Sequence, residues 1–383
     1  MIATLLNKRV LIHCLVLVVV VTLVAAQCGA PATPAPVPTE APAEEAPAEE
    51  APAEEAAPPE EAEAKQIVLI GNQRFGDKGP MDDMAAGLDQ CAADYGFEIK
   101  KLESESAAEH EEDIRAMARE GYDLIMTTFP PMTEPTKGVS LEYPDTLFLG
   151  IYQFINVEGE SYANIWDTEY RGQEVAYMLG SIASNLSQTK KVGYIAGAEE
   201  PSINNEINGF IEGVKATCPE CSFEYAFVGS FEDPATAKEI ALAMYSRGVD
   251  VIQTSAAKSQ LGVIEAAKET GNLVIGDVAD NVDMYPEGFV GYMGVSFSAN
   301  VIEACKLLAE GNYPAGEHGH MDLSNGGYFV PWDAIERFGQ NSPDYADAAA
   351  AVLEAGKDLE AKLISGEVTA EWNPETPIAF EGS

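Results

Sequence analysis

The sequence predicts an α/β fold in which two doubly wound parallel-sheet lobes enclose a hinged cleft. From Gln66 onward, short apolar runs alternate with amphipathic segments of helical period, and strands separated by helices are typical of parallel sheets. The order of strands and helices occurs twice, and its clearest internal match is between the GYDLI run at 121–125 and the GVDVI run at 248–252. In each run a Gly follows a helix and an Asp begins a buried strand. Ligands of such sheets lie beyond the carboxyl ends of the strands.

The first lobe is predicted to comprise residues 66–172. Its strands are short apolar runs bounded by turn residues, and its helices carry apolar side chains with a period close to that of an α-helix. Gly121 ends the second helix, because glycine adopts the left-handed conformation that closes a helix. In chain order the predicted elements are strand 67–70, helix 81–95, strand 97–101, helix 109–119, strand 123–126 and strand 146–149.

The second lobe is predicted to comprise residues 173–290 and to repeat this order. Residues 291–335 are expected to cross back to the first lobe, and residues 336–383 to form a C-terminal helical segment and tail. The predicted elements are helix 173–186, strand 191–195, helix 205–216, strand 223–228, helix 235–247, strand 250–253, helix 261–269 and strand 273–276.

The N-terminal residues 1–28 have the pattern of a lipoprotein signal peptide. Lys8 and Arg9 precede an apolar run at 10–26, and small residues lead to Cys28, although Gln27 is unusual at its position. Acylation of Cys28 would anchor the protein to the extracytoplasmic face of the cell membrane. An uncleaved membrane anchor, for which about 17 apolar residues is the lower limit, and plain secretion are the alternatives. All three place the folded part outside the cytoplasm.

Acidic residues dominate the composition. The chain has 63 acidic and 22 basic residues and a net charge of −41. Residues 29–65 are rich in Pro, Ala and Glu and are expected to form a disordered stalk, because repeated APAEE lacks aromatic side chains and its like charges repel. The stalk contributes ten Glu, yet the chain after residue 64 still carries −33. Nucleic-acid binding requires basic surface, so a nucleic-acid partner is excluded.

Four of the six cysteines lie beyond the stalk. Cys218 and Cys221 form a CPEC motif, for which a local disulfide is the favoured interpretation in an exported protein. A zinc site is the alternative, and it would need two further ligands. Cys91 and Cys305 fall on apolar helix faces and are predicted to be buried.

No catalytic motif is present in the sequence. It contains no GxSxG, no HExxH and no Gly-rich phosphate loop with Lys followed by Ser or Thr. His318 and His320 form an HGH run with no third metal ligand near in sequence, which favours a solvated Gly-rich loop. We therefore expect no enzyme activity, no cofactor and no metal site. A nucleoside hydrolase on a similar scaffold is the enzymatic alternative, and it would need an Asp cluster or metal ligands near the first strand.

Five motifs occur in one order: GYIAGAEEP at 193–201, NGFIEG at 208–213, VGSFEDP at 228–234, GVDVI at 248–252 and GVIEAAKE at 262–269. In this order they resemble those of the basic membrane protein family of solute-binding lipoproteins. The resemblance covers residues 66 to about 335 and implies a type I periplasmic-binding-protein fold. It also implies the binding subunit of an ABC importer, with a permease and an ATPase as partners and a purine base or nucleoside as small-molecule ligand.

The resemblance places the ligand in the cleft loops. In the family an aromatic at the position of Phe231 stacks on the purine ring, and the loop-forming neighbours of Phe231 argue against the alternative of a core residue. The loop at 71–79 resembles the family's first cleft loop, but Pro80 follows where an aromatic is expected. Besides Phe231, the expected contacts are Asp77 and Asn72 as polar groups, Phe75 as a second aromatic face, and Phe129 and Trp166 as cleft walls, with hinge packing as the alternative for Trp166.

Two departures from the family bear on the choice of ligand. Val278 stands where nucleoside receptors carry the Asp that grips the ribose, and Ala299 stands where they carry a Lys. Asp277 or Asp280 could compensate by a small shift, but loss of the sugar grip favours a free base such as adenine over a nucleoside. A sensor ectodomain for the same ligand, and a binding protein for a sugar or amino acid, are the alternative functions.

Overall fold

The computed structural model describes residues 64–76, 79–157, 159–277 and 281–382. Cys28, the signal segment, the stalk up to residue 63, Asp77, Val278 and Asp280 therefore lie outside the described residues. The described residues belong to the compact unit Ala62–Ser383.

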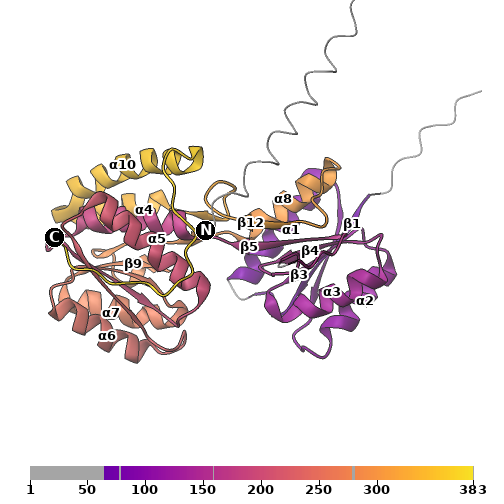
Figure 1. Cartoon of the computed structure of the whole chain (residues 1–383), viewed down its shortest axis with the longest axis horizontal. Helices are drawn as coiled ribbons and strands as arrows, with labels where there is room; N and C mark the ends of the chain where they lie inside the picture. The colour runs from indigo at the N-terminus through magenta and orange to yellow at the C-terminus, as the bar shows by residue number, and fades with distance from the viewer. Residues whose placement is uncertain (1–63, 77–78, 158, 278–280, 383) are drawn as a thin grey trace, which may run out of the picture. The chain divides into compact units, whose positions relative to one another are not determined.

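The first sheet is six-stranded and parallel throughout. Its strand order is β12-β5-β4-β3-β1-β2, so the first strand of the chain lies inside the sheet and the chain winds outward from it in both directions (Figure 1). The strands are β1 (Gln66–Gly71), β2 (Glu98–Glu103), β3 (Leu124–Thr128), β4 (Leu147–Ile151), β5 (Ile165–Tyr170) and β12 (His318–Met321).

Helices cover both faces of this sheet because β1, β3 and β4 carry apolar side chains on both faces. Ile67 and Leu69 of β1 belong to the apolar cluster that includes α1 (Pro80–Tyr95) and α8 (Phe297–Ala309). Val68 and Ile70 point the other way, into a cluster with α2 (His110–Glu120) and α3 (Thr133–Glu142). Alternate side chains of a strand face opposite sides, so a continuous apolar run requires two helical layers.

The second sheet repeats this architecture with five parallel strands. Its order is β10-β9-β8-β6-β7, with α4 and α5 on one face and α6 and α7 on the other (Figure 1). The strands are β6 (Lys191–Ala196), β7 (Ser222–Phe227), β8 (Val251–Ser255), β9 (Leu273–Gly276) and β10 (Phe289–Tyr292). The helices are α4 (Gln173–Leu186), α5 (Pro201–Thr217), α6 (Pro234–Ser246) and α7 (Gln260–Thr270).

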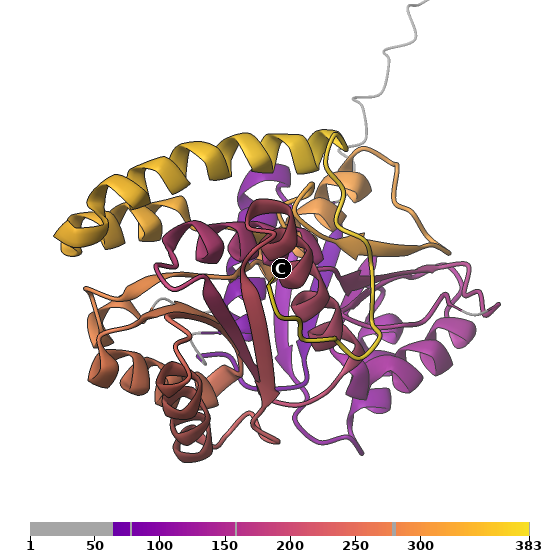
Figure 2. The ribbon, with the colours of Figure 1, turned by 60° about the vertical axis from the view of Figure 1, so that its left-hand side comes forward.

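The chain passes between the two sheets more than once. β5 leads into α4 through Arg171 and Gly172, and after β10 the chain returns to the first sheet through α8 and β12. A short antiparallel pair, β11 (Gly294–Val295) with β13 (Tyr328–Phe329), lies on this path. The last helices are α9 (Trp332–Asn341) and α10 (Ala346–Ser365), and α10 lies along α4 (Figure 2).

The C-terminal tail after α10 runs back across α5 (Figure 2). Three Asn side chains of α5 hold its backbone: Asn204 donates to the carbonyl of Pro374 at 3.1 Å, and Asn208 donates to two carbonyls at 3.0 and 2.8 Å. Asn205 accepts from a tail N–H at 2.8 Å. The tail ends on the edge strand β7, where Phe380 pairs antiparallel with Phe223. It therefore covers an edge that would otherwise expose unpaired backbone groups.

These two sheets confirm the predicted α/β fold class, and several differences have local causes. α5 begins at Pro201 and not at 205, because Pro201 occupies the first turn, where its missing N–H costs nothing. The predictions omitted α3 and β5. The HGH run at 318–320 was interpreted wrongly as a solvated loop: it is the edge strand β12, whose backbone pairs with β5.

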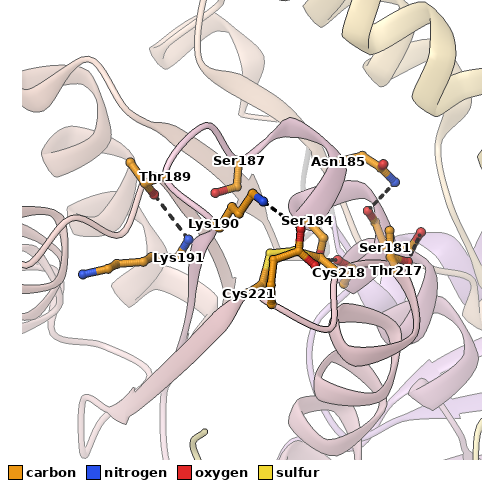
Figure 3. The surroundings of a disulfide bond; sticks show 12 residues. Ser181, Ser184, Asn185, Ser187, Thr189, Lys190, Lys191, Thr217, Cys218 and Cys221 are labelled. Carbon is orange, nitrogen blue, oxygen red and sulfur yellow. Dashed lines mark hydrogen bonds and ion pairs between the residues drawn. A yellow bond between two sulfur atoms is a disulfide. The ribbon is translucent and has the colours of Figure 1, made fainter. Parts of the chain in front are cut away.

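Two disulfides are present in the described part of the chain. Cys218, after the end of α5, bonds to Cys221, just before β7 (Figure 3). Cys91 of α1 and Cys305 of α8 are both buried, as the apolar helix faces predicted, and they are bonded to each other across 214 residues of sequence. That pairing could not be predicted from local sequence, since it depends on the return of the chain to the first sheet.

Candidate ligand-binding site

A pocket of about 440 Å³ lies at the carboxyl ends of strands from both sheets. The second sheet contributes Phe231 after β7, Ser255 and Ala257 at the end of β8, and Asp277 after β9. α5 adds Ile203 and Glu206. The first sheet and its crossing segments contribute Gly79, Pro80 and Asp83 at the start of α1, together with Tyr152, Tyr170, Val295, Phe297 and Tyr328. This position is the one that open parallel sheets use for ligands.

The ring of Phe231 lies against the backbone of Gly197, which follows β6. A Cβ atom added to Gly197 would lie 2.8 Å from Cγ of Phe231 and closer still to Cδ1 and Cε1. Only a glycine therefore allows the ring to rest there. One face of the ring is supported by backbone while Phe231 lines the pocket.

The loop that carries Phe231 is fixed by hydrogen bonds from neighbouring strand ends. The Gly229 N–H donates to the Gly197 carbonyl at 2.8 Å, which joins this loop to the end of β6. The Ser259 hydroxyl donates to the Ser230 carbonyl at 2.9 Å and accepts from the N–H of Asp233 at 2.8 Å. Phe231 is thus held in place before any ligand arrives, which lowers the entropy cost of binding.

Aromatic side chains form the wall contributed by the first sheet. The rings of Tyr170 and Phe297 have centroids 4.7 Å apart, and Tyr152 and Tyr328 lie edge-on to Tyr170 at 5.6 and 6.2 Å. Phe129 does not line the pocket but packs behind the wall, edge-on to Tyr152 and Phe297. Edge-to-face packing of this kind keeps each ring in one orientation.

Three residues with left-handed backbone lie just after strand ends near the pocket. Phe129 follows β3 with φ 63°, Tyr152 follows β4 with φ 55°, and Ala257 follows β8 with φ 46°. Such conformations cost about 1–3 kcal/mol each in a non-glycine residue and gather at functional sites. Two of the three line the pocket directly, and the third supports its wall.

Asp83 and Asp277 are two carboxyl groups of the pocket that also hold backbone. Asp83 accepts from the N–H groups of Phe297 and Ser298 at 2.7 and 3.0 Å, and so closes the N-terminus of α8. Asp277 is buried and accepts from the N–H of Ala257 at 2.8 Å. These bonds fix both side chains at the pocket edge.

Glu206, on α5, is the third carboxyl group of the pocket, and it is buried. Only 7% of the residue is exposed, and its described partners are hydroxyl groups. Ser255 Oγ donates at 2.8 Å, and the hydroxyls of Tyr194 and Tyr328 lie at 3.4 Å. Burial, and secondarily the charge of Asp277, raises the pKa of Glu206 to about 7.

The expected site residues are distributed unevenly around this pocket. Phe231 and Asp277 line it, and Phe129 stands behind its wall. Asn72 bonds to Thr128 at the end of β3, where its N–H donates to the hydroxyl at 2.9 Å. Phe75 and Trp166 lie outside the lining, and Trp166 is buried in β5 against Tyr313. Asp77 and Asp280 fall outside the described residues.

Sequence reasoning missed the aromatic wall and Glu206. Tyr152 lies in a cleft loop, but Tyr170 ends β5, which was not recognised as a strand. Glu206 could have been found from its spacing, since it lies three residues after Ile203 and four before Phe210, on the apolar side of α5. A helix predicted to begin at 205 hid that pattern.

A second polar cluster lies on β5 and β12, and it is not the pocket. His318 Nδ1 lies 2.6 Å from Oδ2 of Asp167, and Glu169 and Arg171 form an ion pair beside it. The hydrogen bond to Asp167, and then that to Glu169, raises the pKa of His318 to about 9. Within the described ranges, no group of three or more His, Cys, Asp or Glu side chains is placed to hold a metal ion.

Known proteins resemble this chain in both sequence and fold. Residues 64–342 match the family described as ABC transporter substrate-binding protein PnrA-like. Basic membrane protein A2 of Borrelia garinii subsp. bavariensis is 27% identical over 232 residues, which are 60% of this chain and 68% of that protein. A solute-binding protein of an ABC transporter system from Aeropyrum pernix K1 has a TM-score of 0.59 at 23% identity and covers 80% of this chain and 92% of its own. Another from Conexibacter woesei has a TM-score of 0.65 at 21% identity, covering 81% and 100%.

Proposed function

The chain belongs to the family of PnrA-like substrate-binding proteins of ABC transporters, and on that premise we propose that its pocket captures a purine, with a free base such as adenine preferred over a nucleoside. The family is one of binding proteins and not of enzymes, so a substrate-binding role follows from membership. The assignment to a purine rests on the chemistry of the pocket.

The observation that carries the proposal is the aromatic pocket edge at Phe231. Its ring rests on the backbone of Gly197 and faces a pocket whose other wall is aromatic. A planar heterocycle gains about 1–3 kcal/mol from each base–aromatic stack, while a sugar or an aliphatic amino acid has no flat π face to offer. The pocket volume of about 440 Å³ is within the range of small-molecule sites.

Polar groups of the pocket match the edge of a nitrogen heterocycle. Glu206, Asp277 and Ser255 bring oxygen atoms to one side of the lining, and carboxylate oxygens accept hydrogen bonds from ring and amino N–H groups. These oxygens come from α5 and from strand ends of the second sheet, which also holds Phe231. One sheet can therefore bind both the face and the edge of the base.

The preference for a free base follows from two positions, 278 and 299, at which this chain lacks the charged residues that bind ribose in nucleoside receptors. Ala299 has only a methyl side chain, and its N–H donates to Ser296 Oγ at 3.1 Å in the cap of α8. Val278, the other replacement, lies outside the described residues. Each charge-assisted hydrogen bond to a ribose hydroxyl would contribute about 1.5–3 kcal/mol, so their absence removes most of the gain from the sugar.

The proposed partners are an ABC permease and its ATPase, with the protein held at the extracytoplasmic face of the membrane through a lipid on Cys28. The apolar run before Cys28 and the stalk after it support this arrangement. No helix among the described residues is long and apolar enough to cross a membrane. A Cys28→Ala precursor that no longer incorporates labelled lipid would support the anchor, and unchanged labelling would contradict it.

Mass spectrometry of small molecules released by denaturing the purified protein tests the ligand class. We expect a purine base to co-purify with the wild-type protein and to be depleted from a Phe231→Ala variant. Phe380→Ala is a matched control, because Phe380 is an aromatic residue of the tail that is not among the residues lining the pocket. A sugar or amino acid released in stoichiometric amount would contradict the proposal.

A further inference from the structure

Glu206 is a buried carboxyl group that lines the pocket, and its role deepens the proposed function, on which this inference rests. We propose that Glu206 in its protonated form determines specificity, by pairing with a ligand edge that offers one hydrogen-bond donor beside one acceptor, so that capture of the ligand requires one proton. The amino group and adjacent ring nitrogen of a 6-aminopurine form such an edge.

The hydrogen bonds of Glu206 leave room for this pairing. Ser255 Oγ is the one close donor, at 2.8 Å, and the hydroxyls of Tyr194 and Tyr328 are at 3.4 Å. A carboxyl group has about four lone-pair sites, and in its protonated form it also has one O–H donor. Protonation turns one of these sites into the O–H donor, so with three hydroxyl contacts the pairing requires that the ligand replace one of the two long contacts at 3.4 Å. One acceptor site and the O–H are then available to a group in the pocket.

The charges around Glu206 favour the proton. The charged group that acts most strongly on Glu206 is Asp277, on the loop after β9. Its other titratable neighbours are three phenols: Tyr194 from β6, Tyr328 from β13 and Tyr152 after β4. Among the described residues that line the pocket there is no Lys, Arg or His. A buried carboxylate beside a like charge is costly, and taking up a proton removes that cost.

The pKa of Glu206, raised to about 7, agrees with this placement. Near neutral pH the group is therefore divided between the two forms, and a ligand that needs the proton shifts it to the protonated form. An ionised Glu206 would meet the lone pair of the ring nitrogen with a negative charge. Affinity is then highest below the pKa of the free protein and falls as pH rises through it.

Packing around the Glu206 side chain restricts which edge of the ligand it can contact. A Cβ atom added to Gly172, between β5 and α4, would lie 3.3 Å from Cγ of Glu206 and 3.0 Å from Cζ of Tyr328. The backbone of Gly172 thus closes the space behind both groups. A carboxyl group packed in this way cannot turn to accommodate an edge of different pattern, and that is how a buried polar group selects among ligands.

Calorimetric titration with adenine from about pH 5.5 to 8.5 tests the proposal. We expect the affinity of the wild-type protein to fall about thirtyfold over this range, since a site with a pKa near 7 is almost fully ionised at the upper end. Glu206→Gln should bind with little pH dependence, because the neutral amide keeps one donor and one acceptor. Glu174→Gln is the matched control: Glu174 also has a raised pKa, mainly from burial, but lies on α4 outside the pocket lining, so the wild-type profile should persist.

Proton uptake gives a second readout that needs no variant. Titrations of the wild-type protein in buffers of different ionisation enthalpy should show uptake approaching one proton at the alkaline end and none at the acidic end. Adenine binding that is independent of pH, or a fall in affinity that persists in Glu206→Gln, would overturn the inference while leaving purine binding intact. No binding of any purine at any pH would instead overturn the proposed function and this inference together.

Discussion

Gly197→Ala is the substitution whose effect on ligand binding can be worked out most directly from the structure. The new Cβ would lie 2.8 Å from Cγ of Phe231 and closer to two other ring atoms, whereas ordinary contacts begin at 3.4 Å. The aromatic ring must therefore move by more than half an ångström toward the pocket or turn away from it. Backbone bonds at Gly197 and Gly229 hold both loops, so we expect the ring to yield and the backbone to stay.

Loss of the stacking position should cost about 1–3 kcal/mol, which is roughly a fivefold to hundredfold loss of affinity. Calorimetric titration with adenine measures this change. Phe231→Ala should lose a similar amount, and the double variant should lose no more than Phe231→Ala alone, because the added methyl group then has no ring to displace. Gly138→Ala is the control, since a Cβ added there meets nothing within 4 Å.

Two results would refute this reasoning. Gly197→Ala with the affinity of the wild type would mean that the position of the Phe231 ring does not matter for the ligand. Additive losses in the double variant would mean that Gly197 acts through another group. Thermal unfolding of each variant separates either result from a simple loss of the fold.

Three further predictions concern stability. If disulfides stabilise by closing loops in the unfolded chain, replacing Cys91 and Cys305 by Ser should lower the free energy of unfolding by up to about 5 kcal/mol, because that bond spans 214 residues. Replacing Cys218 and Cys221 by Ser should lower it by only about 2 kcal/mol, because that bond spans 3 residues. Denaturant titration that ranks the two pairs in the opposite order would refute this account. Hydrogen bonds to Asp167 and then to Glu169 raise the pKa of His318 to about 9. The resulting stabilisation of the folded state is fully present below the ordinary histidine pKa near 6.5 and is lost as pH rises through 9. Between those pH values, the free energy of unfolding of His318→Gln should therefore change less than that of the wild type. Deleting residues 371–382 removes the tail bonds to Asn204, Asn205 and Asn208, each worth about 0.5–1.5 kcal/mol, and should lower the melting temperature, whereas an unchanged melting temperature would show that the tail does not hold α5.

The alternation of strands and helices was predictable because the inner strands other than β5 are local apolar runs. The limits of β9 and α4 coincide with those predicted, and the other inner strands that were predicted differ by one to three residues. Such elements depend mainly on their own side chains, so a short window of sequence contains the information. The position of Phe231 was also readable locally, since Gly, Ser, Asp and Pro around an aromatic residue favour a loop over a core position.

The features that were missed depend on residues distant in sequence. β12 has no apolar alternation, and its strand conformation comes from pairing with β5, about 150 residues earlier. The bond between Cys91 and Cys305 and the packing of Tyr170, Phe297 and Tyr328 arise only after the chain has returned to the first sheet. An acidic residue on a helix is ordinarily solvent-exposed, and the apolar spacing around Glu206 indicates its burial only once α5 is known to begin at Pro201.

The central claim is that the pocket binds the base and does not grip a sugar. Calorimetry with adenine and adenosine on the same protein preparation tests it most directly. We predict that adenine binds at least as tightly as adenosine and that Phe231→Ala weakens both by a similar factor, since the stack is made to the base. Adenosine binding a hundredfold more tightly than adenine would contradict the claim and would show that other residues hold the ribose.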